Sequence, residues 1–387
     1  MKKGIVIGAG IGGLTTAIAL LKKGIDVTVF EQAPQLNEVG AGLWVAPNGM
    51  KVFDKLHLSK EVMLAGTSLE KIEVRDWRGR VVSSILGEKV KAKHQFATTA
   101  IHRAKLQQIL YRQLPAEKVI LNKRFVSFDQ DSEQITAFFA DGKSVSADFL
   151  LLADGINSIF NLNLFSNLQL RYSGQTCWRF VVDFQLPSEV RHEMQEIWSQ
   201  KRGLRVGYSQ INADQVYVYI TNFQKAGETD DALTVLDQLL VLCSEFPAIV
   251  IEILKATRGK QIIRNDLYDF PPLTSWTNGR MALLGDAAHA TTPNLGQGAC
   301  QAIEDAFVIA NELHANEDVF QALKSYEQKR IKKATYITNT SWRFGQVTNT
   351  TGILKSILVS LLRSTPEAVN EKQLDKIYSA SYFSRLG

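Results

Sequence analysis

Residues 3–31 of the chain read KGIVIGAGIGGLTTAIALLKKGIDVTVFE. The β-branched run at residues 5–7 is long enough for a buried strand, and three glycines with the spacing G-x-G-x-x-G follow it. Apolar residues then recur at helical spacing from Leu14 until Gly24, which suits a helix end, and a second apolar run closes on Glu31. The pattern predicts a strand, a tight turn, a helix and a second strand that ends at an acid.

Such a unit is typical of a dinucleotide site. Gly8 permits the tight turn, Gly10 leaves room for a pyrophosphate, and Gly13 lets the helix pack close to the strand. The free N–H groups and the positive dipole end at the helix start would face the diphosphate. Glu31 can accept hydrogen bonds from both ribose hydroxyls and would repel a 2′-phosphate, which favours FAD or NAD over NADP here. An ordinary glycine-rich turn would explain the flanking strand, helix and acid less well.

The composition predicts a soluble globular protein of about two domains. Of its 387 residues, 45% are hydrophobic and 21% are charged. The net charge of +5 is mild, and Lys and Arg are scattered, which disfavours nucleic-acid binding and is compatible with anionic cofactors. The three cysteines are far apart without a C-x-x-C pair, so we expect neither a disulfide framework nor a zinc site, but a reducing cytoplasm. The longest later apolar run, residues 353–362, is too short to span a bilayer.

The texture of the chain changes twice. Short strands separated by turns predict a β-meander over residues 119–152, and its last strand enters the turn Ala153-Asp154-Gly155. Alternating patterns then predict a separate, sheet-based module at residues 171–270. A buried strand returns at residues 280–284 and ends at Gly285-Asp286, before a glycine-rich loop and several helices, of which the tail after Gly352 predicts one.

Two local signals leave alternatives open. Gly40 and Gly42 suit a backbone lying against a flat ligand, but also an ordinary loop before a helix that Asn48 could cap. Arg103 lies in the first turn of a predicted helix, contrary to the dipole preference. It serves either a nearby anionic or carbonyl-rich ligand or only the solvated surface.

Taken together, the chain resembles the class A FAD-dependent aromatic monooxygenases, the family of para-hydroxybenzoate and salicylate hydroxylases. Three fingerprints occur in family order: residues 8–13 with Glu31, residues 153–158, and residues 285–289 with Pro293 and residues 296–298. Residues 40–48 and 101–103 are similar to the salicylate hydroxylase branch. The resemblance implies an α/β fold with a Rossmann-like FAD-binding domain of the GR2 type. Its domains would be a discontinuous FAD-binding domain (1–170 and 278–345), an inserted β-sheet substrate domain (171–277, with the hairpin at 72–95 as a candidate addition) and a C-terminal helical tail (346–387).

The resemblance also assigns cofactor contacts. Arg103 would contact the flavin's ribityl or phosphate region, Trp44 would lie beside the ribityl chain through its backbone, and Val126 would reach the adenine by main-chain bonds. Asp286 would bind a ribityl or ribose hydroxyl, and the amides of residues 296–299 would stabilise negative charge on the reduced flavin ring. The residues expected at the FAD are Gly8, Gly10, Gly12, Gly13, Glu31, Gln32, Trp44, Arg103, Val126, Asp154, Gly155, Asp286, Pro293, Gly296, Gln297, Gly298 and Ala299.

One position departs from the family pattern. The middle fingerprint usually continues to an Arg seven residues after the Asp, where this chain has Asn161. That Arg is tied to NAD(P)H handling in the family. The identity of the reductant, NADH or NADPH, is therefore left open.

The hairpin at residues 205–217 is similar to one in bacterial FAD-dependent urate hydroxylases, where an Arg and a Tyr at these positions contact substrate. Arg205 and Tyr217 would accordingly bind the substrate. If the turn centres on Asn212, period-two alternation also places Tyr219 on their face of the sheet. The alternative is a solvated Arg with two half-buried tyrosines, and the pair Trp178-Arg179 is similarly ambiguous.

The activity that the resemblance implies is monooxygenation. NAD(P)H would reduce FAD, O₂ would add to the reduced flavin, and a flavin C4a-hydroperoxide would deliver one oxygen to an aromatic or heteroaromatic small molecule. Alternatives on the same fold are a reductase or dehydrogenase, an antibiotic-inactivating oxygenase, an epoxidase and a non-catalytic redox sensor. The six histidines show no metal spacing, and we expect His289 to order its loop rather than to shuttle protons. Oligomeric state does not follow from the sequence.

Overall fold

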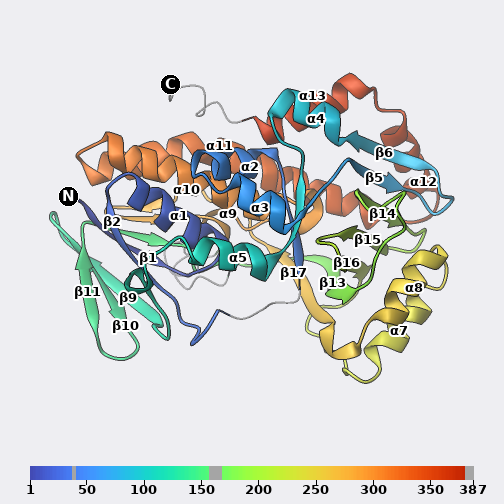
Figure 1. Cartoon of the computed structure of the whole chain (residues 1–387), viewed down its shortest axis with the longest axis horizontal. Coiled ribbons are helices and arrows are strands. Elements are labelled where there is room, and N and C mark those ends of the chain that lie inside the picture. The colour runs from blue at the N-terminus through green and yellow to red at the C-terminus, as the bar shows by residue number, and fades with distance from the viewer. Residues whose placement is uncertain (37–40, 157–167, 380–387) are drawn as a thin grey trace.

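The computed structural model of the protein describes residues 1–36, 41–156 and 168–379. The positions singled out above that lie outside these ranges are Gly40, Ser158 and Asn161. The described part combines a mainly parallel sheet flanked by helices with a larger, mainly antiparallel sheet, and Figure 1 shows them on opposite sides of the molecule. The expected α/β architecture is confirmed.

The smaller of these two sheets has six strands in the order β18-β19-β12-β1-β2-β8. Its strands are β1 (Lys3–Ile7), β2 (Asp26–Phe30), β8 (Val119–Ile120), β12 (Phe149–Leu152), β18 (Thr277–Asn278) and β19 (Met281–Leu283). All neighbours except β18 and β19 pair in parallel. Carboxyl ends of parallel strands meet at one edge of a sheet, so the turns after β1, β12 and β19 come together although they are far apart in sequence.

Two helices pack side by side next to this sheet, α1 (Ile11–Lys22) and α10 (Gly298–Ala315). A Cβ atom placed on Gly12 would lie 3.0 Å from the Cβ of Ala302, so small residues let the two helices approach closely. The close approach brings the N-terminus of α10 near the turn that opens α1.

The predicted meander is correct only for its central part. An antiparallel sheet of order β11-β10-β9 contains β9 (Phe125–Gln130), β10 (Ile135–Phe139) and β11 (Ser144–Ala147). The outer pieces, β8 and β12, belong to the parallel sheet instead. The reason is visible in β12, whose residues are all buried, as suits a strand covered on both faces, whereas β10 alternates.

The larger sheet has seven strands in the order β17-β13-β16-β15-β14-β5-β6. They are β5 (Lys71–Arg75), β6 (Val81–Leu86), β13 (Arg171–Asp183), β14 (Glu193–Trp198), β15 (Arg205–Gln210), β16 (Gln215–Phe223) and β17 (Ile263–Asp269). One face packs under α7 (Val235–Leu242) and α8 (Ala248–Ala256), which lie on the outer side in Figure 1. The hairpin β5–β6 extends the sheet because β5 pairs in parallel with β14.

A small sheet of order β3-β7-β4 connects the two regions. Its strands are β3 (Gly42–Val45), β4 (Thr67–Ser68) and β7 (Thr99–His102), and its helices are α2 (Pro47–Lys55), α3 (Ser59–Ala65), α4 (Gly87–His94) and α5 (Arg103–Tyr111). A Cβ on Gly42 would lie 2.4 Å from Cγ of Tyr217, so β3 lies directly against β16.

The C-terminal region is helical. It comprises α11 (Val319–Thr348), α12 (Gly352–Arg363) and α13 (Glu367–Tyr378), and α11 runs beside α10 in Figure 1. The tail therefore forms two helices rather than the single one predicted, because Pro366 lacks the N–H needed to continue α12 and instead caps α13. None of the helices in the described ranges combines the length and the apolar character needed to cross a membrane.

Candidate functional site

The turn between β1 and α1 has the geometry that its glycines predict. Gly8 has a φ of +100°, and a Cβ there would lie 2.5 Å from the carbonyl oxygen of Ala153. A Cβ on Gly13 would lie 2.0 Å from the carbonyl oxygen of Gly8. A Cβ on Gly10, by contrast, would meet no protein atom within 4 Å. Packing of the protein itself thus requires glycine at two positions, and the third leaves open space beside the backbone.

The start of α1 offers free donors to this open space. Gly10 is the N-cap residue, no side chain caps the helix, and no acid lies in its first turn. Uncapped N–H groups at a helix N-terminus suit an anionic group such as a diphosphate. The turn itself is held from both sides, because Glu31 Oε2 accepts from Ala9 N at 2.7 Å and Gln107 Nε2 donates to Ala9 O at 2.7 Å.

Asp286 begins the short helix α9 (Asp286–His289), directly after Gly285, whose φ is +60°. Its side chain is exposed to solvent, yet desolvation by the surrounding protein raises the pKa of its carboxyl, and His289 and Arg103 oppose that shift. A ligand can therefore reach the carboxyl, although many protein atoms surround it. Arg103 is exposed in the first turn of α5, so two of the predicted cofactor residues act on each other across the site.

A second uncapped helix start lies beside Asp286. Helix α10 begins after Gln297, no side chain caps it, and no acid lies in its first turn. A Cβ on Gly298 would lie 3.7 Å from Asp286 Oδ1. Gly296, in the left-handed region at a φ of +61°, turns the chain into this helix. The two uncapped helix starts and Asp286 thus gather at one edge of the parallel sheet.

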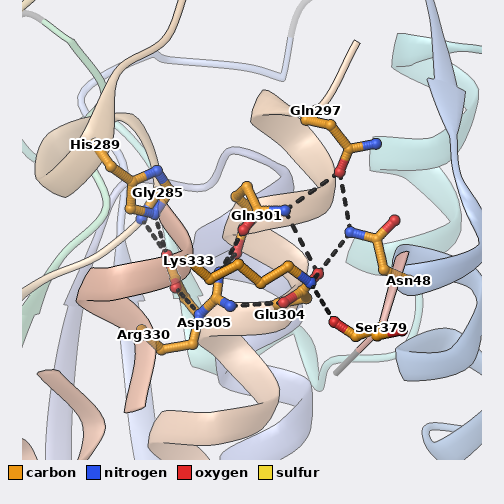
Figure 2. Close-up of polar contacts among 10 residues, drawn as sticks. All are labelled: Asn48, Gly285, His289, Gln297, Gln301, Glu304, Asp305, Arg330, Lys333 and Ser379. Carbon is orange, nitrogen blue, oxygen red and sulfur yellow. Dashed lines mark hydrogen bonds and ion pairs between the residues drawn. The ribbon is translucent and has the colours of Figure 1, made fainter. Parts of the chain in front are cut away.

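A buried network of charges holds these loops from below (Figure 2). Asp305 Oδ2 accepts from His289 Nε2 at 2.6 Å and from Gly285 N at 2.9 Å, and Asp305 Oδ1 accepts from Arg330 Nε at 2.7 Å. Burial raises the pKa of Asp305, but His289 and Arg330 together outweigh it and lower this pKa to about 2. The turn that presents Asp286 is thereby fixed to helices α10 and α11, and His289 has the loop-ordering position expected of it.

Glu304 anchors the second half of the network. Arg330 Nη1 donates to it at 2.6 Å, Lys333 Nζ at 2.7 Å and Asn48 Nδ2 at 2.6 Å. Asn48 Nδ2 also donates to Gln297 Oε1 at 3.0 Å, as Figure 2 shows. Asn48 is therefore not the helix cap that the sequence allowed. It links the start of α2 to the loop before α10, and Ala46 is the N-cap residue of α2.

The larger sheet faces this edge with a polar, aromatic surface. Gly207 pairs with Tyr219 and Ser209 with Tyr217, and the turn is closed by Asn212 Oδ1, which accepts from Gln215 N at 2.9 Å. Residues paired directly across strands share a face, so the expectation that Arg205, Tyr217 and Tyr219 share one face is confirmed.

Trp44 connects that face to the loop at residues 293–297, which leads into α10. Its indole lies edge-on to the rings of Tyr217 and Tyr219, each at a centroid distance of 5.7 Å, and its Nε1 donates to Ser209 Oγ at 3.0 Å. A Cβ on Gly296 would lie 3.5 Å from Cε3 of this indole. An aromatic wall thus stands beside the loop that leads into α10.

Arg205 is held within the sheet rather than solvated. Only 2% of it is exposed, its Nε donates to Thr221 Oγ1 at 3.1 Å, and its Nη1 lies 3.5 Å from Glu196 Oε1. Its Nη2 also donates to Asn294 Oδ1, in the turn that precedes Gly296. Arg205 therefore connects the seven-stranded sheet to the turn at residues 293–296. Its direct contact with a substrate stays a prediction.

Comparison with known proteins assigns this geometry to a family. Residues 3–341 match the family model described as the FAD binding domain. The chain is 35% identical over 353 residues to the aurachin C monooxygenase/isomerase of Stigmatella aurantiaca, with 90% of each protein covered. It is 31% identical over 333 residues to an FAD-dependent urate hydroxylase of Klebsiella pneumoniae, with 86% of each covered. The crystal structure of Klebsiella pneumoniae HpxO with FAD and uric acid has a TM-score of 0.90 to this chain at 28% identity, with 98% of both chains covered.

The chain belongs to the class A FAD-dependent aromatic monooxygenases. The recognition, the α/β fold with its FAD-binding region, the FAD cofactor and the monooxygenase activity expected from the sequence are thereby confirmed.

The residues present in this monooxygenase fit FAD. The open space beside Gly10 and the uncapped start of α1 suit the diphosphate, and Glu31 follows β2 as a ribose acceptor would. Asp286 and the start of α10 lie far along the chain but at the same sheet edge, as a ligand long enough to reach both requires.

The other predicted cofactor residues have no test in these contacts, and their roles stay predictions. Val126 is 46% exposed on β9, which is an edge strand of its sheet. Gln32 is exposed next to the half-buried Glu31, and Pro293 is exposed in the turn before Gly296. Trp44 O accepts from Cys300 Sγ at 3.7 Å, which fixes the backbone that the family places beside the ribityl chain.

Several residues of the monooxygenase site escaped sequence reasoning. They are the buried Glu196, Glu304, Asp305 and Arg330 and the half-buried Gln107 and Lys333. Only one signal could have found some of them, namely the two adjacent acids Glu304 and Asp305 inside the mainly apolar stretch at residues 299–310. Such acids in a buried helix need partners, but the pattern does not say which cations supply them.

Proposed function

We propose that this monooxygenase uses NADH or NADPH and O₂ to hydroxylate an aromatic or heteroaromatic small molecule in the cytoplasm. The observation that carries the proposal is the meeting of the aromatic wall (Trp44, Tyr217 and Tyr219) with the uncapped start of α10 beside Gly296. The FAD-dependent urate hydroxylase relative supports a flat ring as the substrate class, since urate is a purine.

Each group in this site has a task in such a reaction. FAD, when bound, supplies the electron transfer and the activation of O₂. Residues 296–299 present backbone N–H groups where negative charge develops, an electrostatic role of the oxyanion-hole kind. Trp44 and Tyr217 orient a ring by stacking or edge contacts and exclude water from its surface.

The proposed residue roles follow the same division. Arg205 and Tyr217 border the substrate side, and Arg205 keeps the Asn294 turn in register with the sheet. The seventeen cofactor residues predicted from the sequence are proposed as the FAD contacts. We also propose the domain division at 1–170 with 278–345, 171–277 and 346–387, in which the β5–β6 hairpin joins the substrate sheet.

The test is oxygen-coupled turnover of the purified yellow protein. NADH or NADPH oxidation and O₂ uptake are measured over a panel of phenols, purines, quinolones and polyketides, and products are identified by mass. The proposal predicts that one aromatic class raises both rates together and gains one oxygen atom. Flavin reduction that is independent of any aromatic compound, with no oxygenated product, would refute it and favour a reductase.

A further inference from the structure

Two arginines lie on the face of the large sheet that meets the flavin side. Arg179 on β13 pairs with Tyr219 on β16, which pairs with Gly207 on β15, so these three residues form one row across the face. Arg205 lies in the adjacent row, two residues along β15 from Gly207. Trp178 points to the opposite face, where it packs in the apolar cluster under α7 and α8. Arg179 and Arg205 therefore face the same site.

The charge of Arg205 is compensated inside the protein. Glu196 is 5% exposed, and its Oε1 lies 3.5 Å from Arg205 Nη1 while it accepts from Trp198 Nε1 at 2.5 Å. Its Oε2 accepts from the hydroxyl of Tyr219. A buried arginine paired with a buried carboxylate and with two neutral acceptors has little charge left for a ligand.

Arg179 has no such compensation. It is half-buried, and among the residues that the structure describes it forms no ion pair. Its one hydrogen bond in that part of the chain runs from Nη2 to the neutral Asn265 Oδ1, at 3.3 Å, and its buried Nε has no partner there. A desolvated guanidinium with unused donors is costly unless an anionic oxygen meets it.

The surroundings direct this charge toward the reaction site. Burial raises the pKa of the Tyr217 phenol, and the positive charges of Arg179 and Arg103 both oppose that shift. The phenol of Tyr217 therefore lies within electrostatic range of both Arg179 on the sheet and Arg103 at the start of α5. The same ring touches Trp44 in the aromatic wall.

We propose that Arg179 is the residue that recognises an anionic oxygen of the aromatic substrate, a carboxylate or a ring enolate, whereas Arg205 is a positioning residue. The inference rests on the proposed function and narrows its substrate class to acidic rings. Arg205, whose charge Glu196 compensates, holds the Asn294 turn, and any contact of its own with the substrate does not depend on the substrate's charge.

The test compares aromatic acids with their neutral amides as ligands of the FAD-loaded enzyme. Benzoate, salicylate and quinoline-4-carboxylate, each with its amide, are titrated near neutral pH, and binding is followed by the perturbation of the flavin absorption spectrum. In the wild type at least one acid binds roughly tenfold tighter than its amide, because a charge-assisted pair replaces a neutral contact. Arg179→Gln abolishes this preference and leaves amide binding unchanged.

Matched variants separate charge from structure. Arg205→Gln on the same face weakens acid and amide by equal factors and so retains the preference. Arg179→Lys keeps the charge but loses the planar fork, and it retains a reduced preference for the acid. If Arg179→Gln fails to bind FAD, Arg179→Lys tests the proposal instead. The acid-over-amide preference of Arg179→Lys must then be lower than that of the wild type by roughly threefold or more.

Three results would overturn the inference: a wild type with no preference for any acid, a preference that survives in Arg179→Gln, and a preference lost only in Arg205→Gln. A rise in the KM for NADH or NADPH in Arg179→Gln with unchanged acid preference would also overturn it, since the cation would then serve the reductant. Failure of the proposed function is distinguishable, because these titrations need no turnover.

Discussion

Buried charges are compensated differently beneath the FAD-binding loops, residues 8–13 and 285–297, and on the seven-stranded substrate-side sheet. Beneath the loops, Asp305 and Glu304 are fully enclosed, and Arg330 and Lys333 satisfy them in a closed set. On the sheet, Glu196 compensates Arg205, but Arg179 has no carboxylate among the described residues. A closed set of charges fixes backbone geometry, whereas an open charge remains available to a ligand. The loops are therefore built to hold a constant cofactor, and the sheet is built to select a variable substrate.

The largest effect is expected from opening the closed set. Arg330→Met leaves two buried carboxylates without their main partner and destabilises the protein by about 3–5 kcal/mol. Urea unfolding monitored by circular dichroism measures the loss. Lys201→Met is the control, because Lys201 is 48% exposed in its ion pair with Glu245, and a surface pair contributes about 0–1 kcal/mol. Equal losses in the two variants would show that the network does not carry the stability of the loops.

The glycine turn separates cofactor binding from folding. Gly13→Ala forces a Cβ against the Gly8 carbonyl and destabilises even the FAD-free protein by about 1–3 kcal/mol. Gly10→Val adds a side chain where no protein atom lies within 4 Å, so the FAD-free protein keeps its melting temperature while FAD affinity falls by roughly tenfold or more. Thermal unfolding with and without FAD measures both. If the Gly10→Val protein purified with full FAD content, the pyrophosphate of FAD could not lie beside Gly10.

Acid titration sharpens the description of the closed set. The folded pKa of Asp305 is lowered to about 2 from an ordinary value of 3.8, so its contribution to stability is complete above pH 4 and is lost as the pH falls toward 2. This contribution is about 2 kcal/mol. The difference in unfolding free energy between the wild type and Asp305→Asn should therefore shrink between pH 4 and pH 2. A difference that stays constant over this window would contradict a lowered pKa.

The smallest effect is expected at the hydrogen bond between Trp44 and Ser209, which joins the two regions. Ser209→Ala removes the acceptor of Trp44 Nε1 and costs about 1 kcal/mol of stability. The freed indole loosens the aromatic wall, so the KM for an aromatic substrate rises while FAD content is unchanged. Thr221→Val on the neighbouring strand, which removes an acceptor of Arg205 instead, is the matched comparison. Loss of FAD in Ser209→Ala would place Trp44 in the cofactor site alone.

The same contrast explains what the sequence could predict. The turn at residues 8–13 and the acid that follows β2 were readable because their requirement is backbone geometry, which only glycine satisfies at Gly8 and Gly13. The family resemblance, whose three fingerprints occur in order, also implied that Asp286 contacts the same cofactor as this turn. The prediction that β8 and β12 belong to a meander was wrong. Both strands pair in the parallel sheet, because pairing partners are set by the whole fold.

The polar network and the compensation of Arg205 could not be predicted in this way. Arg330 reaches Asp305 from a different helix, and Glu196 reaches Arg205 from the neighbouring strand β14, so neither pair has a characteristic spacing in the sequence. Alternation placed Arg205 and Tyr217 on one face but did not show whether a charge was free. Side-chain partners of that kind depend on packing, which residue types alone leave undetermined.

The most direct test of the central claim, that the aromatic wall presents a ring to oxygen-reactive FAD, is turnover under ¹⁸O₂ with the aromatic compound that most stimulates NADH or NADPH oxidation. The product is analysed by mass spectrometry, and H₂O₂ is assayed in parallel. We expect one ¹⁸O atom in the product for each NADH or NADPH consumed, with little H₂O₂. Recovery of all the reducing equivalents as H₂O₂, with no label in the aromatic compound, would contradict it.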